Sequence, residues 1–111
     1  MAYDDDLADR IRELLGLEAG VTETRMFGGL AFTINGHIAV TASGQGGIMV
    51  RVDPERSDSL VASTGARVAE MRGRPMRGWL RVDAPDLGTD AQLGEWVRLG
   101  VTRARTLPAK G

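Results

Sequence analysis

The chain has no cysteine, one histidine, one lysine and five aromatic residues among its 111 residues. The lack of cysteine excludes disulfides, thiolate catalysis and cysteine-ligated metal sites. There is no long apolar run near the start, so we expect neither a signal peptide nor a membrane span, and a cytoplasmic location. The net charge of −1 argues against a general nucleic-acid coat or a membrane-surface binder, because both rely on excess positive charge.

The residue types that carry catalysis are sparse. His37 is the only candidate for a histidine base or metal ligand, and its place at the end of a hairpin favours a solvated turn residue. No serine has the G-x-S-x-G context of a nucleophile, and Asp83 and Asp86 flank Pro85 in a pattern typical of a turn. We therefore predict no catalytic residue, no metal site and no cofactor, and we expect that the protein is not an enzyme.

The segment from Arg25 to Val52 is the centre of the predicted fold. Apolar residues recur at every second position within residues 30–34, 37–43 and 48–52, and glycine-rich turns separate these stretches. A further strand is predicted over Val21 to Met26. The pattern is that of an antiparallel meander in one domain, residues 1–111.

The turn at Asn35-Gly36 allows two registers. A two-residue loop would pair Ile34 with His37 and would send the apolar residues of the two strands to opposite faces. A three-residue loop with Gly36 as a left-handed bulge residue pairs Phe32 with Ile38 and Leu30 with Val40. The second register is predicted because it buries these four side chains together. It leaves a small, mildly polar opposite face made by Ala31, Thr33, His37, Ala39 and Thr41.

Three helices are predicted around these strands. The first runs over Asp4 to Leu15, where the acidic cluster Asp4-Asp5-Asp6 is expected to cap the helix and to complement its dipole. The second is short, beginning at Asp53-Pro54 and ending at Thr64-Gly65. The third begins at a capping box formed by Thr89 and Gln92 and ends near Leu107. Gly100 is expected to allow close packing of this helix.

Two more strands are predicted between the second and third helices, over Arg67 to Met71 and Trp79 to Val82, with a glycine- and arginine-rich loop from Arg72 to Trp79. Trp79 is predicted as a core residue. The fold class is α+β: two layers, an antiparallel sheet of about five strands, and helices packed on one face. The element order is α-β-β-β-(β)-α-β-β-α, where the bracket marks that the meander has three or four strands.

Candidate binding residues cluster around glycines and arginines. Gly28-Gly29 permits either a small anion-binding nest or a tight turn with a close backbone approach. Arginine suits the bidentate recognition of phosphate and carboxylate. The candidate site for an anion or a partner is therefore the following set: Arg25, Gly28, Gly29, Arg51, Arg74 and Arg77.

Two segments of opposite charge stand out. Residues 67–81 hold five arginines against Glu70, a local charge of +4, and residues 4–18 hold six acids against two arginines, a local charge of −4. These segments have three alternatives: pairing within the fold, pairing across a dimer, or no pairing. Together with the mildly polar sheet face, they favour a homodimer.

Four motifs occur together in one order along the chain: Arg25-Met26-Phe27-Gly28-Gly29, Asn35-Gly36, Gly46 to Arg51, and Gly73 to Leu80. With these motifs the chain resembles the N-terminal domain of TfoX (Sxy), the bacterial competence regulator, over about Leu7 to Pro108. The resemblance implies a compact α+β domain and a role in transcription regulation, with no catalytic residue to transfer. The C-terminal helical domain of two-domain members is expected to be absent from this chain.

The resulting functional prediction is a non-enzymatic regulatory module that works by binding another protein. The first alternative is nucleic-acid binding through the arginines of residues 67–81, which is not favoured. The second is a small-ligand or enzyme pocket near Arg25, Gly28 and Gly29.

Overall fold

The computed structural model describes residues 3–16, 18–26 and 28–108. The helices are α1 (Asp5–Leu14), α2 (Ser57–Ser63) and α3 (Asp90–Thr106), and the strands are β1 (Val21–Met26), β2 (Gly29–Ile34), β3 (His37–Ala42), β4 (Ile48–Arg51), β5 (Arg67–Met71) and β6 (Arg74–Val82). Two 3-10 turns, η1 (Pro54–Arg56) and η2 (Ala84–Leu87), complete the elements. The order agrees with the predicted one, including the bracketed strand, and the α+β fold class is confirmed.

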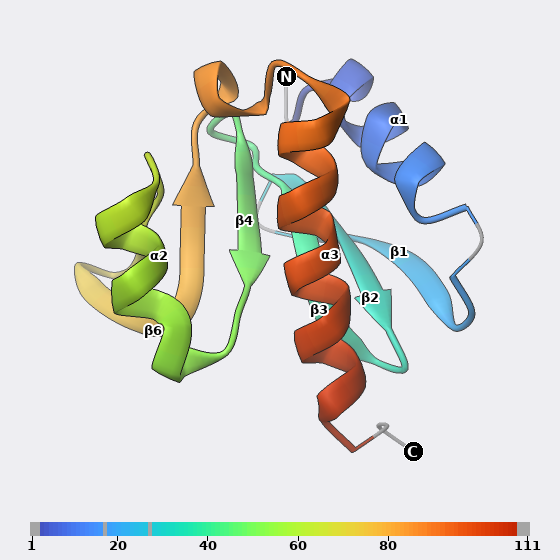
Figure 1. The fold of residues 1–111 in the computed structure, drawn as a ribbon. Helices are drawn as coiled ribbons and strands as arrows, with labels where there is room; N and C mark the ends of the chain where they lie inside the picture. The colour runs from blue at the N-terminus through green and yellow to red at the C-terminus, as the bar shows by residue number, and fades with distance from the viewer. Residues whose placement is uncertain (1–2, 17, 27, 109–111) are drawn as a thin grey trace.

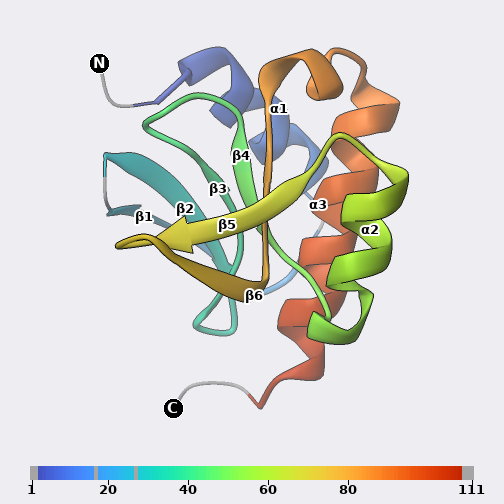
Figure 2. The ribbon, with the colours of Figure 1, turned by 90° about the vertical axis from the view of Figure 1, so that its left-hand side faces the viewer.

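The strands form one antiparallel sheet in the order β1-β2-β3-β4-β6-β5. The helices lie against one side of this sheet, with α3 crossing β3 and β4 and α1 lying toward β1 and β2 (Figure 1). Turning the molecule shows the sheet and the helices as two layers, with the β5–β6 hairpin projecting away from α3 (Figure 2). We call the two sides of the sheet the helix-covered face and the open face.

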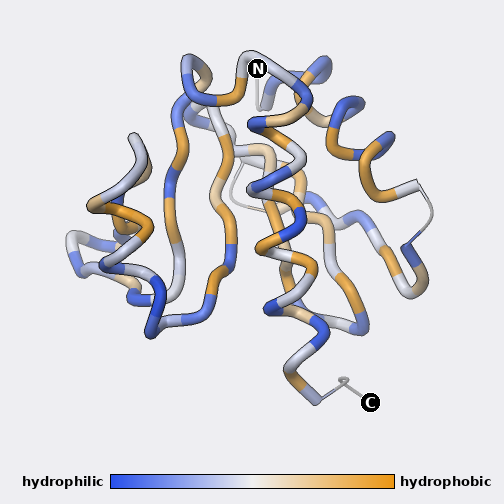
Figure 3. The backbone as a smooth tube through the Cα atoms, viewed as in Figure 1, coloured by the Kyte–Doolittle hydropathy of each residue, from blue (hydrophilic) through white to orange (hydrophobic). Residues whose placement is uncertain are grey.

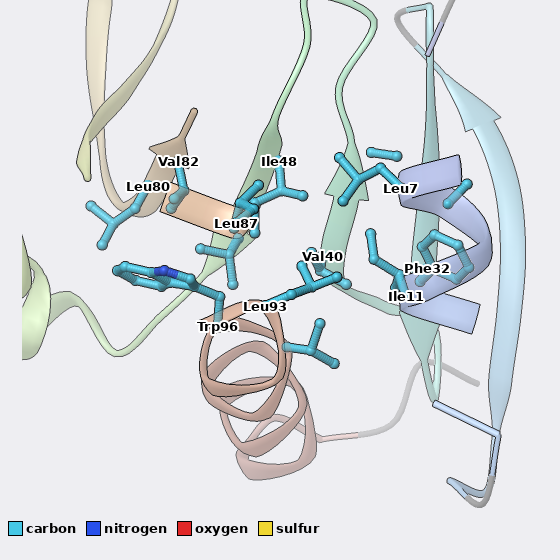
Figure 4. Packing of buried hydrophobic residues seen from close by; sticks show 14 of the residues in the cluster. Leu7, Ile11, Phe32, Val40, Ile48, Leu80, Val82, Leu87, Leu93 and Trp96 are labelled. Carbon is cyan, nitrogen blue, oxygen red and sulfur yellow. The ribbon is translucent and has the colours of Figure 1, made fainter. Parts of the chain in front are cut away.

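The core lies between the sheet and the helices. Phe32, Val40 and Ile48 are completely buried on the helix-covered face. Leu7 and Ile11 of α1 pack over Phe32 on one side, while Leu93 and Trp96 of α3 pack toward β4 and β6 on the other (Figure 4). Hydrophobic residues recur between hydrophilic ones along α1 and α3, as expected for helices that bury one side (Figure 3).

The helix starts follow the predicted caps. An Asp4 carboxylate oxygen accepts hydrogen bonds from the backbone N–H groups of Asp6 and Leu7 at 2.9 and 3.2 Å. Thr89 and Gln92 form the expected capping box at the start of α3. These contacts satisfy N–H groups that would otherwise lack partners, so the Asp4-Asp5-Asp6 cluster has a structural role.

Gly100 sets the distance between α3 and the sheet. A Cβ atom at this position would lie 2.4 Å from the carbonyl oxygen of Ala39, so only glycine fits without a shift of the backbone. Ala39 and Ala104 are completely buried beside it, in a small cluster with Ile34. Small residues on both elements thus let α3 pack closely on β3.

The predicted register of the β2–β3 hairpin is wrong. Ile34 pairs with His37 across a two-residue turn in which Asn35 and Gly36 have φ angles of 53° and 88°. A β-bulge resolves the conflict of faces: Phe32 pairs with Val40 but Thr33 pairs with Ile38, so Ala39 is the extra residue. The bulge keeps Val40 in the core and moves Ile38 to the open face.

The loop predicted from Arg72 to Trp79 is also wrong, because β6 already begins at Arg74. Arg72 and Gly73 form a two-residue turn with φ angles of 55° and 76°, which joins β5 to β6 as a hairpin. Gly78, at φ 90°, lies within this long strand, where its backbone passes close to Pro54. This hairpin extends the sheet beyond β4.

Candidate functional site

A groove with a volume of about 410 Å³ lies on the open face of the sheet. Four of the five methionines line it, together with an isoleucine and a tryptophan: Met26, Met49, Met71, Met76, Ile38 and Trp79. We call this site the methionine groove. Its volume falls within the range of about 300–1,000 Å³ typical of ligand-binding clefts.

The groove exists because the sheet curls. Met26 belongs to the edge strand β1 and Met71 to the opposite edge strand β5, yet both line the same cavity. Bulges in the β2–β3 and β5–β6 pairs increase the local twist, and the β5–β6 hairpin arches across the open side (Figure 2). The curvature therefore brings together side chains that lie at opposite ends of the sheet order.

The floor is a row of residues paired across three strands. Thr41 pairs with Met49, and Met49 pairs with Arg81, so these side chains share the open face. Thr41 is only 6% exposed, and its hydroxyl oxygen is buried without a hydrogen-bond partner in the described part of the chain. A buried hydroxyl without a partner is costly, so the floor contains a locally unfavourable polar group.

Arg81 fastens the β3–β4 loop to one end of the groove. Its guanidinium donates hydrogen bonds to the Ser43 hydroxyl at 3.2 Å and to the Gly46 carbonyl oxygen at 3.1 Å. Gly47 lets this loop approach β6, since a Cβ there would lie 2.3 Å from the Val82 carbonyl oxygen. Both partners of Arg81 are neutral, so its positive charge has no counter-ion in these contacts.

Trp79 lines the groove and is therefore not the core residue that was predicted. The Arg51 guanidinium lies over its ring, 4.8 Å from the ring centroid, in the geometry of a cation–π contact. The pKa of Arg51 is lowered, first by partial burial and second by the positive charge of Arg103. Trp96, by contrast, is the tryptophan of the core.

The Gly28-Gly29 pair provides a close backbone approach. A Cβ on Gly29 would lie 2.5 Å from the Ala42 carbonyl oxygen, and a Cβ on Gly44 would lie 2.5 Å from that of Gly28. The β1–β2 turn therefore packs against the β3–β4 loop, and Gly29 also lines the groove. The preceding residue of this motif, Phe27, lies outside the described residues.

The predicted arginines take different positions. Arg25 pairs with the buried Leu30 in the β1–β2 register and is exposed on that side of the strand, whereas Arg51 lies on the open face beside Trp79. Arg74 and Arg77 are exposed on β6 and do not line the groove. The charged residues that do line it are Glu70, Arg72 and Arg81.

The two oppositely charged segments do not pair with each other in the described residues. Arg12 binds Asp9 and Glu23, Arg105 binds Glu18, and Arg67 binds Asp83. Two acids of the acidic segment, Asp9 and Glu18, are therefore paired with arginines of α1 and α3. Arg72, Arg74 and Arg77 form none of these ion pairs and remain exposed on the β5–β6 hairpin.

Three other functional features were considered in the described residues: a histidine base, a metal site and a membrane-spanning helix. His37 lies at the end of the β2–β3 hairpin, where its Nε2 is 2.5 Å from the Pro108 carbonyl oxygen, and it does not line the groove. Within residues 3–16, 18–26 and 28–108, no group of three or more histidine, aspartate or glutamate side chains is placed to hold a metal ion. None of the helices there combines the length and apolar character needed to cross a membrane.

A second cavity of about 320 Å³ lies between α3 and η1 and is lined by Arg56, Arg98 and Arg103. Arg98 pairs there with Glu95. Arg103 lies in the last turn of α3, where a cation complements the helix dipole. This cavity is smaller than the methionine groove, which makes the methionine groove the stronger candidate site.

Sequence reasoning missed the methionine groove, although one signal was present. Met49, Met71 and Met76 occur in strands where β-branched residues are the common choice, and methionine is typical of adaptable binding surfaces.

Comparison with curated proteins and with solved structures yielded no match. The family model described as TfoX N-terminal domain matches residues 13–104. The chain therefore belongs to the TfoX N-terminal domain family.

Proposed function

We propose that the chain is a non-enzymatic regulatory module that binds another protein in the methionine groove. The observation that carries the proposal is the groove itself, because it is preformed, largely apolar and lined by flexible side chains. Methionine side chains adapt to differently shaped apolar partners, which suits recognition of a protein segment more than positioning of a reacting group. Membership of the TfoX N-terminal domain family supports a role in bacterial transcription regulation, exercised in the cytoplasm.

The composition of the groove supports a binding role over a catalytic one. Its titratable side chains are Glu70, Arg72 and Arg81, and no histidine lies among its lining residues. Arg81 is already engaged by Ser43 and Gly46, which leaves Glu70 as the only candidate for proton transfer. General acid–base chemistry needs a second group within reach of the substrate, so we assign the groove to recognition.

The test is capture of partners with matched variants of the full chain. Met49→Glu places a charge on the groove floor, while Ser59→Glu places the same charge on the exposed side of α2. Tagged wild-type and variant proteins are incubated with nuclease-treated extract of the source cells, and retained proteins are identified by mass spectrometry. Circular dichroism melting of both variants verifies that they remain folded.

We expect one or more proteins to be retained by the wild type and by Ser59→Glu but lost with Met49→Glu. The same set of proteins on all three baits would reject the groove as the docking site. Retention of no protein by the wild type would reject the protein-binding proposal as a whole.

Homodimerisation is the second part of the proposal. The outer edges of β1 and β5 are the sheet edges without a neighbouring strand in the described sheet, and such edges can pair with a second copy. Light scattering at micromolar concentration measures this directly. A molecular mass that corresponds to a monomer would reject homodimerisation, and the proposal for the groove would not be affected.

One observation favours nucleic-acid binding as a second candidate. Arg72, Arg74 and Arg77 are exposed together on the β5–β6 hairpin, where they form no ion pair with a carboxylate of the described residues. Binding of this kind would be strongly salt-dependent and would weaken in the double variant Arg74→Ala/Arg77→Ala. Unchanged DNA and RNA affinity in that variant would exclude this candidate.

A further inference from the structure

The charges at the methionine groove are mainly positive. Arg72 and Arg81 line it against Glu70, and Arg51 adds a third cation beside Trp79. No carboxylate of the described residues lies within ion-pair distance of these three arginines. The groove therefore combines a largely apolar lining with arginine charges that form no ion pair with a carboxylate of the described residues.

Arginines outside the groove, by contrast, form ion pairs with carboxylates. Arg10 pairs with Asp90 at 3.3 Å, Arg67 with Asp83 at 2.6 Å, and Arg105 with Glu18 at 2.7 Å. The chain carries 15 acidic residues, enough to match its 14 basic ones. The positive charge at the groove thus results from the placement of the acidic residues elsewhere in the fold, because the chain as a whole has no excess of basic residues.

A second copy of this chain is a poor occupant of the groove. Among the described residues, the exposed large hydrophobic side chains are Leu14, on α1, and Met71, which belongs to the groove itself. The apolar side of α1 is buried in the chain's own core through Leu7, Ala8 and Ile11. Two grooves facing each other would bring like charges together, which costs free energy.

We infer that the methionine groove binds an acidic segment of a partner protein that also carries large apolar side chains. This inference rests on the proposed function and names the chemistry of its partner. The apolar side chains of the segment fill the space among Met49, Met76 and Trp79. Its aspartate or glutamate side chains meet Arg72 and the guanidinium groups at the groove edge, where charge-assisted hydrogen bonds form.

The test uses three synthetic amphipathic peptides with identical leucine and phenylalanine positions. The remaining positions are glutamate in the first peptide, glutamine in the second and lysine in the third. Binding to the full chain is followed by NMR of ¹³C-labelled methionine methyl groups, which report from inside the groove. Single Met→Leu substitutions assign the signals of Met26, Met49, Met71 and Met76.

We expect the glutamate peptide to shift the groove methyl signals and to bind about tenfold more tightly than the lysine peptide at low salt. The difference should shrink to about twofold at 1 M salt, where the Debye length falls to about 3 Å. Burial of the methionines against apolar side chains should persist at high salt, because that contribution is not screened.

Charge reversal at Arg72 tests the role of the groove charge, and charge reversal at Arg56 is the matched control. Arg72→Glu should weaken the glutamate peptide about tenfold and strengthen the lysine peptide, with no new backbone strain beyond the φ of 55° that Arg72 already has. Arg56→Glu changes the net charge equally, but Arg56 lies in η1 beside the α3 cavity. That control variant should bind all three peptides as the wild type does.

The outcomes separate the inference from the function on which it rests. Equal affinity for the three peptides, or preference for lysine, overturns the acidic partner but keeps the groove as a protein-binding site. Failure of all three peptides to shift any groove methyl signal overturns both. Dodecanoate that displaces the glutamate peptide and binds more tightly would assign the groove to a small amphiphile instead of a protein segment.

Discussion

The two faces of the sheet use alternate residues of the same strands, yet they are built from different side chains. On β4, Ile48 and Val50 are completely buried on the helix-covered face, while Met49 and Arg51 lie partly exposed on the open face. Isoleucine and valine are stiff at χ1 and define one packing arrangement, whereas methionine has three rotatable bonds and adapts. The sealed face thus specifies the fold, while the open face carries side chains that can adopt several conformations.

The largest expected effect compares adjacent residues on these two faces. Ile48→Ala removes a completely buried side chain from the core and should lower the free energy of unfolding by about 3–4 kcal/mol. Met49→Ala removes a partly exposed side chain from the groove floor and should cost only about 1 kcal/mol, because little new cavity is enclosed. Urea unfolding measures both, and equal losses would contradict the distinction between the faces.

The next effect probes how tightly the helix-covered face is sealed. Gly100→Ala would place a Cβ 2.4 Å from the Ala39 carbonyl oxygen and should destabilise the protein by about 1–3 kcal/mol. Gly94 is the control on the same helix, because the nearest atom to an added Cβ is Leu14 Cδ2 at 3.7 Å. Gly94→Ala should therefore stabilise by about 0.5–1 kcal/mol. Thermal unfolding measures the stability of both variants. If both substitutions stabilised the protein, α3 would not be closely packed on the sheet at Gly100.

Local signals predicted the elements well because their causes are local. The acidic cap of α1, the Thr89–Gln92 capping box and the apolar alternation of the strands each depend on neighbours within a few residues. The α+β class and the element order follow from these signals. The first part of β6 was predicted as a loop because glycine and arginine mark irregular structure in general, while Arg72-Gly73 is the tight turn of a hairpin.

The register of the β2–β3 hairpin shows where pattern reasoning is too simple. A regular ladder forces a choice between the favoured Asn35-Gly36 turn and a common buried face for the two strands. The structure keeps both by inserting one residue, Ala39, as a bulge. The smallness of Ala39 is explained by α3, because Ala39 is completely buried in one cluster with Ala104 of that helix. That helix lies about sixty residues farther along the chain, so the residues around Ala39 give no sign of it.

The methionine groove could not be predicted because it depends on curvature of the whole sheet. Met26 and Met71 lie on opposite edge strands and come to one cavity only after the sheet curls. The predicted arginines were chosen for their charge and their motif positions, and Arg25 falls on the side of β1 that carries the Leu30 pair. Of the predicted set, Gly29 lines the groove and Arg51 covers Trp79.

A smaller effect of opposite sign is expected in the groove floor. Thr41→Val replaces the buried hydroxyl, which lacks a partner, by a methyl group of similar size and should stabilise the protein by about 1 kcal/mol. Thr33→Val is the control on the neighbouring strand, since the Thr33 hydroxyl donates a hydrogen bond to the Thr22 carbonyl oxygen at 3.4 Å. That control should be neutral or slightly destabilising. A destabilised Thr41→Val would show that the hydroxyl has a partner in solution.

The smallest effect concerns the ion pair that ties α1 to β1 at the edge of the helix-covered face. Arg12 donates to both Glu23 carboxylate oxygens, at 2.6 and 2.7 Å, and the same guanidinium lies 6.0 Å from the centre of the Phe32 ring. These hydrogen bonds lower the pKa of Glu23 below its ordinary value of 4.5, against the opposing effect of partial burial. A carboxyl group with a lowered pKa stabilises the fold above its unfolded pKa and loses that contribution as the pH falls through the folded value.

Glu23→Gln should therefore lower the melting temperature by no more than a few degrees at pH 7, because an exposed ion pair contributes little. The difference from wild type should shrink as the pH falls below 4.5 and vanish once the pH lies below the lowered pKa of folded Glu23. Glu13→Gln gives the same charge change on α1, and Glu13 takes part in none of the ion pairs of the described residues. A pH-independent loss in Glu23→Gln would contradict a role for the charge of Glu23, because glutamine keeps the aliphatic part of the side chain and removes only the charge.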